Sequence, residues 1–184
     1  MSDDDRARWD CRYSDPIAGS DDEVTLPAVF QPFADSFPAK GRALDLACGR
    51  GGVAVWLARR GLQVWGCDVS PVAIAQAWAL AERSGVAACC DFEVIDLDDG
   101  LPDGPAADVV ICNRFRDARL DQPIVERLAR GGLLAISTLS EVDASPGPFR
   151  VKAGELRQAF DGLDVIAAQE ADGEAWLLAR RSRP

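Results

Sequence analysis

From Arg42 to Arg180 the chain alternates short apolar runs with amphipathic segments, and this alternation restricts the folds it can adopt. Apolar runs of five to nine residues that are bounded by glycine, proline or aspartate are typical of buried strands, and the segments between them have helical periodicity. Strands that alternate with helices form a mostly parallel sheet with helices on both faces. The expected strands are 42–47, 63–68, 91–95, 107–112 and 131–139, and the expected helices are 51–60, one that starts at Pro71, 120–129 and 153–160.

The last two apolar segments, 163–169 and 175–180, are separated by the turn residues Asp172 and Gly173, which predicts a hairpin. The expected fold is therefore an α/β, Rossmann-like, doubly wound sheet of seven strands, mostly parallel, with an antiparallel C-terminal hairpin strand. A length of 184 residues suits one domain. We expect a core at 40–184 and a polar, proline-rich segment at 1–39 that covers the substrate as a lid.

Composition excludes several kinds of site. The chain has no histidine, which removes triads that depend on it and nearly all catalytic zinc sites. Its net charge of −10 argues against nucleic acid as a partner. The six cysteines form no C-x-x-C pair, so no metal is expected. With no apolar run near 20 residues and an acidic start, we expect no membrane partner and a cytoplasmic protein with reduced thiols.

Glycine and aspartate residues follow the first three expected strands, where ligands of such sheets bind. The first strand leads into the turn 45–51, and its glycines let the backbone and the next helix N-terminus approach a ligand. Asp68 lies nineteen residues after Gly49, at the place of an acid that accepts ribose hydroxyls. Asp96, before Leu97, suits an exocyclic amine of a purine. Each aspartate also suits a helix cap or a solvated loop.

Asp45 separates two classes of cofactor. Folds that bind nicotinamide nucleotides also use a glycine-rich turn, and Gly49, Gly51 and Ala54 match G-x-G-x-x-A. An acid inside the preceding strand would repel their pyrophosphate. It suits S-adenosylmethionine, which has an ammonium and a sulfonium group and no phosphate. An NAD(P)-dependent oxidoreductase remains the alternative.

The motifs DLACGRG at 45–51, Asp68 after VWGC, and Asp96 within VIDLDD resemble those of class I S-adenosylmethionine-dependent methyltransferases. The segment from Trp9 to Tyr13 and the stretch 148–156 are similar to the tellurite-resistance and thiopurine methyltransferase group. The resemblance covers Trp9 to Arg180.

The resemblance implies a role for each matching residue. Asp45 would lie near the cofactor's ammonium group, Asp68 would hold the ribose, and Asp96 would bind the adenine amine. Asn113, after the fourth strand, would lie near the transferred methyl group. Two positions depart from the family: Ala47 replaces its usual glycine, and Asp117 replaces a histidine of some relatives. The cofactor set is Trp9, Arg12, Asp45, Ala47, Cys48, Gly49, Gly51, Asp68, Val69, Asp96, Leu97 and Asn113, and the catalytic candidates are Asn113, Asp117 and Tyr13.

The expected reaction is in-line methyl transfer to a sulfur, oxygen, nitrogen or chalcogen nucleophile of a small molecule, with S-adenosylhomocysteine as product. Positioning can supply much of this catalysis. The absence of histidine favours a nucleophile that is already anionic or easily deprotonated. Arg114, Arg116 and Arg119 could hold an anion or pair with Asp117 and Asp121. A non-catalytic binding protein of methyltransferase fold is a further alternative, and either a monomer or a homodimer is expected.

Overall fold

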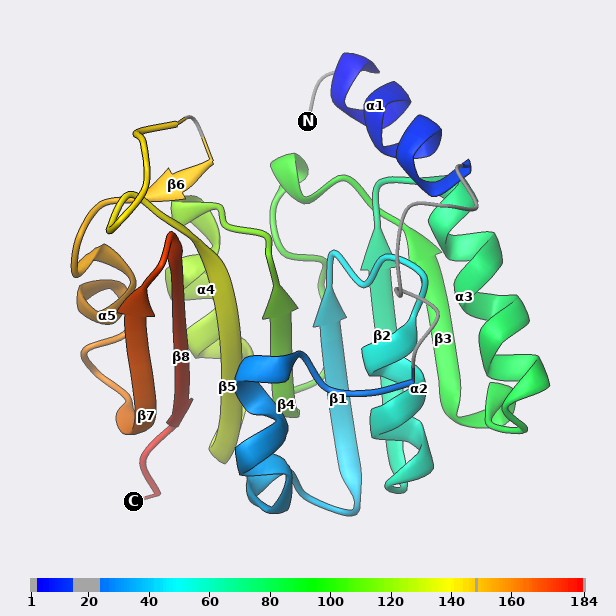
Figure 1. Ribbon diagram of the computed structural model, residues 1–184. Helices are drawn as coiled ribbons and strands as arrows, with labels where there is room; N and C mark the ends of the chain where they lie inside the picture. Colours follow the sequence, from blue (N-terminus) through cyan, green and yellow to red (C-terminus); the bar gives the residue numbers. More distant parts are fainter. Residues whose placement is uncertain (1–2, 15–23, 148, 184) are drawn as a thin grey trace. The chain divides into compact units, whose positions relative to one another are not determined.

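The computed structural model describes residues 3–14, 24–147 and 149–183, in which strands and helices alternate along the chain (Figure 1). The chain divides into two compact units, Met1–Gly104 and Pro105–Pro184.

The first unit contains three parallel strands in the order β3-β2-β1. Helix α2 packs against β1 and β2, and helix α3 packs against β2 and β3. The helix expected from Pro71 is present, and the Ser70 side chain caps it by accepting a hydrogen bond of 3.2 Å from the Ala73 amide. The elements are α1 (Asp3–Ser14), η1 (Ala28–Ser36), β1 (Gly41–Leu46), α2 (Gly52–Arg59), β2 (Leu62–Asp68), α3 (Pro71–Arg83), η2 (Ala87–Cys89), β3 (Cys90–Val94) and η3 (Leu97–Asp99).

Helices α2 and α3 approach each other closely where α2 begins. Gly51 has a φ of 79°, and a Cβ atom added to it would lie 2.8 Å from the Cβ of Ala77. Any larger residue would push α2 away from α3, so this glycine serves helix packing as well as the turn before it.

The second unit contains strands in the order β4-β5-β8-β7. Strands β4 and β5 are parallel, whereas β8 runs antiparallel to both β5 and β7. The short β6 pairs with the end of β5. Asp172 and Gly173, with φ of 51° and 77°, form the hairpin turn, as expected. The elements are β4 (Ala107–Asn113), η4 (Ala118–Leu120), α4 (Asp121–Arg127), β5 (Leu128–Ser140), β6 (Arg150–Val151), α5 (Glu155–Ala159), β7 (Asp164–Ala171) and β8 (Glu174–Arg180).

The α/β fold class is confirmed, with mostly parallel strands, an antiparallel C-terminal hairpin and helices packed against the strands of each unit. The described residues contain eight strands because the two-residue β6 adds to the seven that were expected. Four consecutive residues of β4, 109–112, are at most 1% exposed, as in a strand with both faces covered. No described helix has both the length and the apolar character that crossing a bilayer requires.

Candidate cofactor site

The turn after β1 is built from left-handed residues. Ala47, Gly49 and Gly51 have φ values of 54°, 54° and 79°, and the turn is closed by a hydrogen bond of 3.0 Å from the Gly51 amide to the Cys48 carbonyl. A left-handed conformation costs a residue with a Cβ atom about 1–2 kcal/mol. The backbone therefore explains why glycine is usual at position 47, and Ala47 carries strain.

Asp45 is the buried carboxylate of this turn. It is 2% exposed and accepts a hydrogen bond from the amide of Ala54, in the first turn of α2. Its Oδ2 is buried and has no hydrogen-bond partner among the described residues. Burial, and then the nearby charge of Asp68, raise the pKa of Asp45 to about 8, against the smaller effect of the Ala54 bond. A cationic donor such as an ammonium group would satisfy this oxygen and stabilise the charged form.

Asp68, at the end of β2, holds the turn to the start of α3. Its Oδ2 accepts a hydrogen bond of 3.0 Å from the Gly49 amide, and its Oδ1 accepts one of 2.9 Å from the Ser70 amide. Burial raises the pKa of Asp68, and these two amide bonds oppose that rise. A carboxylate has about four acceptor positions, so Asp68 keeps acceptor capacity for ribose hydroxyls.

The carboxylate after β3 has a local partner. Asp96 caps the short helix η3, and its Oδ1 accepts a hydrogen bond of 2.9 Å from the Asp98 amide. The Ile95 amide donates to the Asp68 carbonyl at 3.0 Å, which ties the ends of β3 and β2 together. Leu97 and Val69 are both buried, at 4% exposed. The helix-cap interpretation of Asp96 is thus realised, beside the strand end that carries Asp68.

Helix α1 lies against the glycine turn. A Cβ atom added to Gly49 would be 3.0 Å from the Tyr13 hydroxyl, so the phenol ring faces this residue. The Tyr13 carbonyl accepts hydrogen bonds from Arg50 at 3.1 Å and Gln76 at 3.0 Å. The ring of Trp9 stacks on that of Tyr13 with centroids 5.9 Å apart. The covering role of 1–39 stays a prediction: helix α1 lies against the turn, whereas Phe37, which follows η1, packs against Trp56 of α2. Residues 15–23 lie outside the described residues.

Arg12 is exposed, and its guanidinium lies 5.3 Å from the centre of the Trp9 ring. The cysteine thiols at the turn and on the neighbouring strand β2 are poor nucleophiles. Burial raises the pKa of the Cys48 thiol well above its usual value, and it raises that of Cys67 to about 12. All six cysteines are free thiols, and Cys11 is the exposed one.

In the second unit, Asn113 ends β4 and is fixed by β5. Its side-chain oxygen accepts a hydrogen bond of 2.7 Å from the Ser137 hydroxyl. Arg114 follows with a φ of 58°, and its amide donates to the Ser137 carbonyl at 2.9 Å. Ser137 is buried and was missed by sequence reasoning, because a serine within an apolar strand carries no distinctive pattern.

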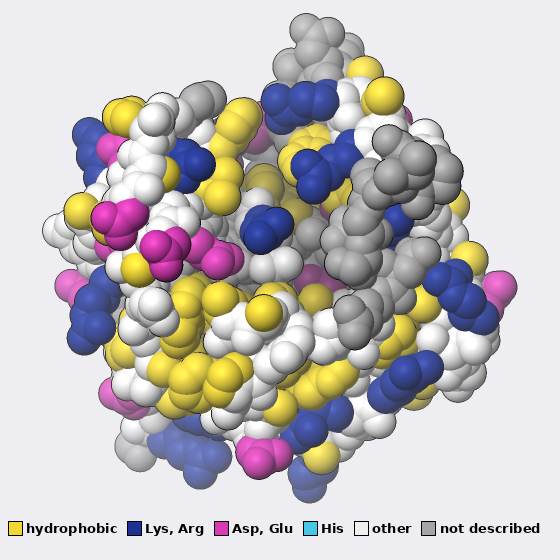
Figure 2. Space-filling view, in the orientation of Figure 1, with side chains coloured by type: hydrophobic (Ala, Val, Ile, Leu, Met, Phe, Trp, Pro, Cys, Tyr) yellow, Lys and Arg dark blue, Asp and Glu magenta, His cyan; other side chains and the backbone are white. Residues whose placement is uncertain are grey.

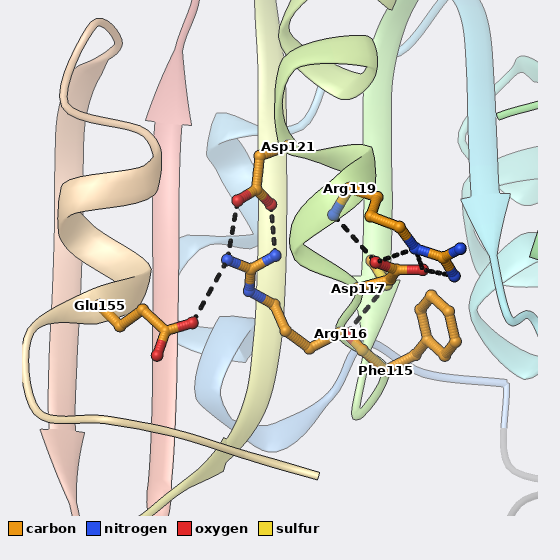
Figure 3. A network of polar contacts seen from close by, with 7 residues as sticks. Phe115, Arg116, Asp117, Arg119, Asp121 and Glu155 are labelled. Atoms are coloured by element: carbon orange, nitrogen blue, oxygen red, sulfur yellow. Dashed lines mark hydrogen bonds and ion pairs between the residues drawn. The ribbon is translucent and has the colours of Figure 1, made fainter. Parts of the chain in front are cut away.

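The arginines after β4 pair with acids (Figure 3). Arg119 donates to both oxygens of Asp117, at 3.0 Å from Nε and 2.5 Å from Nη2. Arg116 makes a bidentate pair with Asp121, and it lies 4.0 Å from Glu155 of α5. The hydrogen bonds from Arg119 lower the pKa of Asp117. The pairing interpretation of this patch is therefore confirmed for Arg116 and Arg119, and Asp117 is a weak base.

No histidine is available on the surface, and the visible face carries both basic and acidic side chains (Figure 2). Charged groups of a ligand can therefore be bound only by Asp, Glu, Lys and Arg side chains among the ionisable residues of this kind. Among the described residues, no group of three or more Asp, Glu or Cys side chains is placed to hold a metal ion.

Residues 43–132 match a family described as a methyltransferase domain. This part of the chain is similar to methyltransferase domains. The resemblance to class I S-adenosylmethionine-dependent methyltransferases is confirmed by this match and by the fold. A curated relative, ribosomal protein L11 methyltransferase of Thermus thermophilus, is 28% identical over 144 residues, which are 77% of this chain and 52% of the relative. The chain spans about half, or less, of the length of the curated relatives it matches.

Two solved methyltransferases or related proteins have a fold similar to that of this chain. TehB from Haemophilus influenzae has a TM-score of 0.76 at 17% identity, over 95% of this chain and 67% of TehB. Magnesium protoporphyrin IX methyltransferase from Synechocystis PCC 6803, solved with bound S-adenosylmethionine, has a TM-score of 0.64 at 20% identity, over 84% of this chain and 76% of that one.

Proposed function

We propose that the protein transfers the methyl group of S-adenosylmethionine to a small-molecule acceptor. The observation that carries the proposal is the buried Asp45 carboxylate, whose Oδ2 has no partner among the described residues. Burial raises the pKa of this carboxyl to about 8, and a cationic ligand such as the cofactor's ammonium group would satisfy the oxygen and stabilise the charged form. A pyrophosphate beside Asp45 and Asp68 would instead meet two carboxylates, which disfavours a nicotinamide nucleotide.

The residues of the first unit fit the cofactor. Asp45 would pair with its ammonium group, and Asp68 would accept its ribose hydroxyls while keeping its bonds to Gly49 and Ser70. When bound, the cofactor supplies an electrophilic methyl group on sulfur. The remaining proposed contacts are the turn residues Ala47, Cys48, Gly49 and Gly51, the adenine-side residues Val69, Asp96 and Leu97, the covering residues Trp9 and Arg12, and Asn113.

In this proposal the acceptor is already deprotonated when it reacts, so the protein needs no strong general base. Asp117 is held by Arg119 with a lowered pKa, so it accepts a proton poorly at neutral pH. Tyr13, beside Gly49 in the first unit, is proposed to orient the acceptor, and Asn113, held by Ser137 in the second unit, stays a separate catalytic candidate. We therefore favour an acceptor that ionises easily, such as a thiol or a chalcogen anion.

A small acceptor suits a chain with a net charge of −10. The Thermus thermophilus relative is named for ribosomal protein L11, so a protein acceptor is the second candidate. We also propose that the chain is a single-domain protein of the cytoplasm, a monomer or homodimer, in keeping with its free thiols.

Titration calorimetry with S-adenosylhomocysteine and NAD⁺ side by side tests the cofactor. We expect micromolar binding of S-adenosylhomocysteine and none of NAD⁺, and the reverse result would overturn the proposal. An acceptor screen with methyl-labelled cofactor then compares thiols, phenols and chalcogen anions with ribosomal protein L11. Label transfer to L11 alone would replace the small-molecule acceptor with a protein.

A further inference from the structure

One chain of hydrogen bonds joins the glycine turn to helix α1. The Gly49 amide and the Ser70 amide donate to the two oxygens of Asp68, at 3.0 and 2.9 Å. The Ser70 hydroxyl accepts from the Ala73 amide and donates its proton to Oδ1 of Asp10, on α1. Ser70 therefore fixes Asp68 with its backbone and Asp10 with its side chain.

A second attachment lies one turn further along α1. The Tyr13 carbonyl accepts from Arg50, which belongs to the glycine turn, and from Gln76, which belongs to α3. The Tyr13 ring faces Gly49. The first attachment thus ends on Ser70, the cap of α3, and the second ends on the glycine turn and on α3 itself. Residues of the turn and of the α3 cap also hold Asp68.

We infer that Asp10 is a positioning residue for cofactor binding: through Ser70 it docks α1 on the site and couples that docking to the orientation of Asp68. This inference rests on the proposed function and adds to it a residue that does not touch the cofactor. The two events are coupled because docking of α1 on Ser70 also fixes the Asp68 carboxylate, which is proposed to bind the ribose.

The chemistry of the contact distinguishes two variants of Asp10. Asp10→Ala removes the acceptor for the Ser70 hydroxyl, whereas Asp10→Asn keeps a side-chain oxygen that can accept the same bond. Asp10→Ala should weaken binding of S-adenosylhomocysteine by about tenfold, because the lost bond has a charged acceptor. Asp10→Asn should restore binding to within about threefold of the wild-type chain.

The experiment measures calorimetric affinity for S-adenosylhomocysteine in the full chain and hydrogen exchange of the amides of residues 6–14 without ligand. Asp10→Ala should speed that exchange, and Asp10→Asn should not. Combining Asp10→Ala with Ser70→Ala should weaken binding no more than the stronger single variant, since both break one contact. Cys11→Ala, an exposed neighbour on the same helix, is the control and should leave both readouts unchanged.

The outcomes separate the two proposals. A wild-type chain that binds no S-adenosylhomocysteine overturns the proposed function. A wild-type chain that binds it, with Asp10→Ala binding equally well, overturns the role of Asp10 alone. Asp10→Asn behaving like Asp10→Ala would also overturn it, because the hydrogen bond would not be what matters.

Discussion

The acids of the glycine turn and the acids after β4 are held in opposite ways. Among the described residues, Asp45 and Asp68 accept hydrogen bonds from backbone amides and form no ion pair, and burial raises the pKa of both. Asp117 and Asp121 are each paired with an arginine. Carboxylates that a chain leaves without a cation are available to a cationic ligand, whereas those already paired serve structure. The difference supports the proposal that the first region holds the cofactor.

The largest expected effect is a change with pH in the free energy of unfolding, and it tests whether Asp45 lacks a cationic partner. Its pKa of about 8 lies above the value of 3.8 in an unfolded chain, so the folded chain holds its proton more tightly. The resulting stability is fully present below about pH 4 and is lost as pH rises to about 8. Between pH 5.5 and 8 the wild-type chain without ligand should lose roughly 3 kcal/mol from this residue.

Urea unfolding at several pH values measures this loss, and Asp45→Asn should remove most of it. Asp68, whose pKa is also raised, contributes in the same direction and remains in the variant. Equal slopes for the two proteins would show that Asp45 is ionised throughout, and the contrast between the two regions would fail.

The second effect concerns Asp68. Replacing it with alanine removes the proposed ribose acceptor and the partners of the Gly49 and Ser70 amides, so S-adenosylhomocysteine should bind at least about tenfold more weakly, or about 1.4 kcal/mol. Calorimetry measures the change. Asp91→Ala, at an exposed position of the neighbouring β3, is the matched control. Unchanged affinity in Asp68→Ala would show that the ribose assignment is wrong.

A smaller effect is expected at Ala47, where the strain of the turn is stored. Ala47→Gly relieves a left-handed alanine but adds freedom to the unfolded chain, which leaves a net gain of about 0.5–1 kcal/mol. Thermal unfolding should show a rise of about 2 °C. The same substitution at exposed Ala75, inside α3, should instead lower stability by about 1 kcal/mol. A lower melting temperature for Ala47→Gly would contradict the strain.

The smallest effect is expected in the other region. Asp117→Asn weakens the pair with an exposed arginine, so it should change the affinity for S-adenosylhomocysteine by less than about twofold. Calorimetry beside Asp68→Ala provides the comparison. A tenfold loss in Asp117→Asn would mean that both sets of acids serve the cofactor.

Sequence reasoning predicted most strands and helices because their apolar runs were long enough to carry a clear period. It missed α1, whose apolar residues Ala7, Trp9, Cys11 and Tyr13 occur at every second position and so lack a helical period. The tiny β6 was missed since two residues carry no pattern. The hairpin turn was predicted because Asp172 and Gly173 tolerate a positive φ.

The strand ends and the glycine turn were predictable because they depend on apolar runs and glycine spacing, which are local in sequence. The partners of those residues were not. The contact between Asp10 and Ser70 joins residues sixty positions apart, and the bond from Ala54 to Asp45 depends on how α2 docks. The arginines after β4 could be read either as an anion site or as ion pairs until the geometry showed Arg116 and Arg119 bound to acids.

The exposure of Cys11 has a practical consequence for chemical labelling. Cys48, Cys67 and Cys90 have thiol pKa values raised by burial, and a protonated thiol reacts slowly with alkylating dyes. Cys11 is the exposed thiol, on the helix that covers the glycine turn. A maleimide fluorophore should therefore attach to Cys11 first. The fluorescence of the labelled chain would then report on the position of α1 without an engineered cysteine.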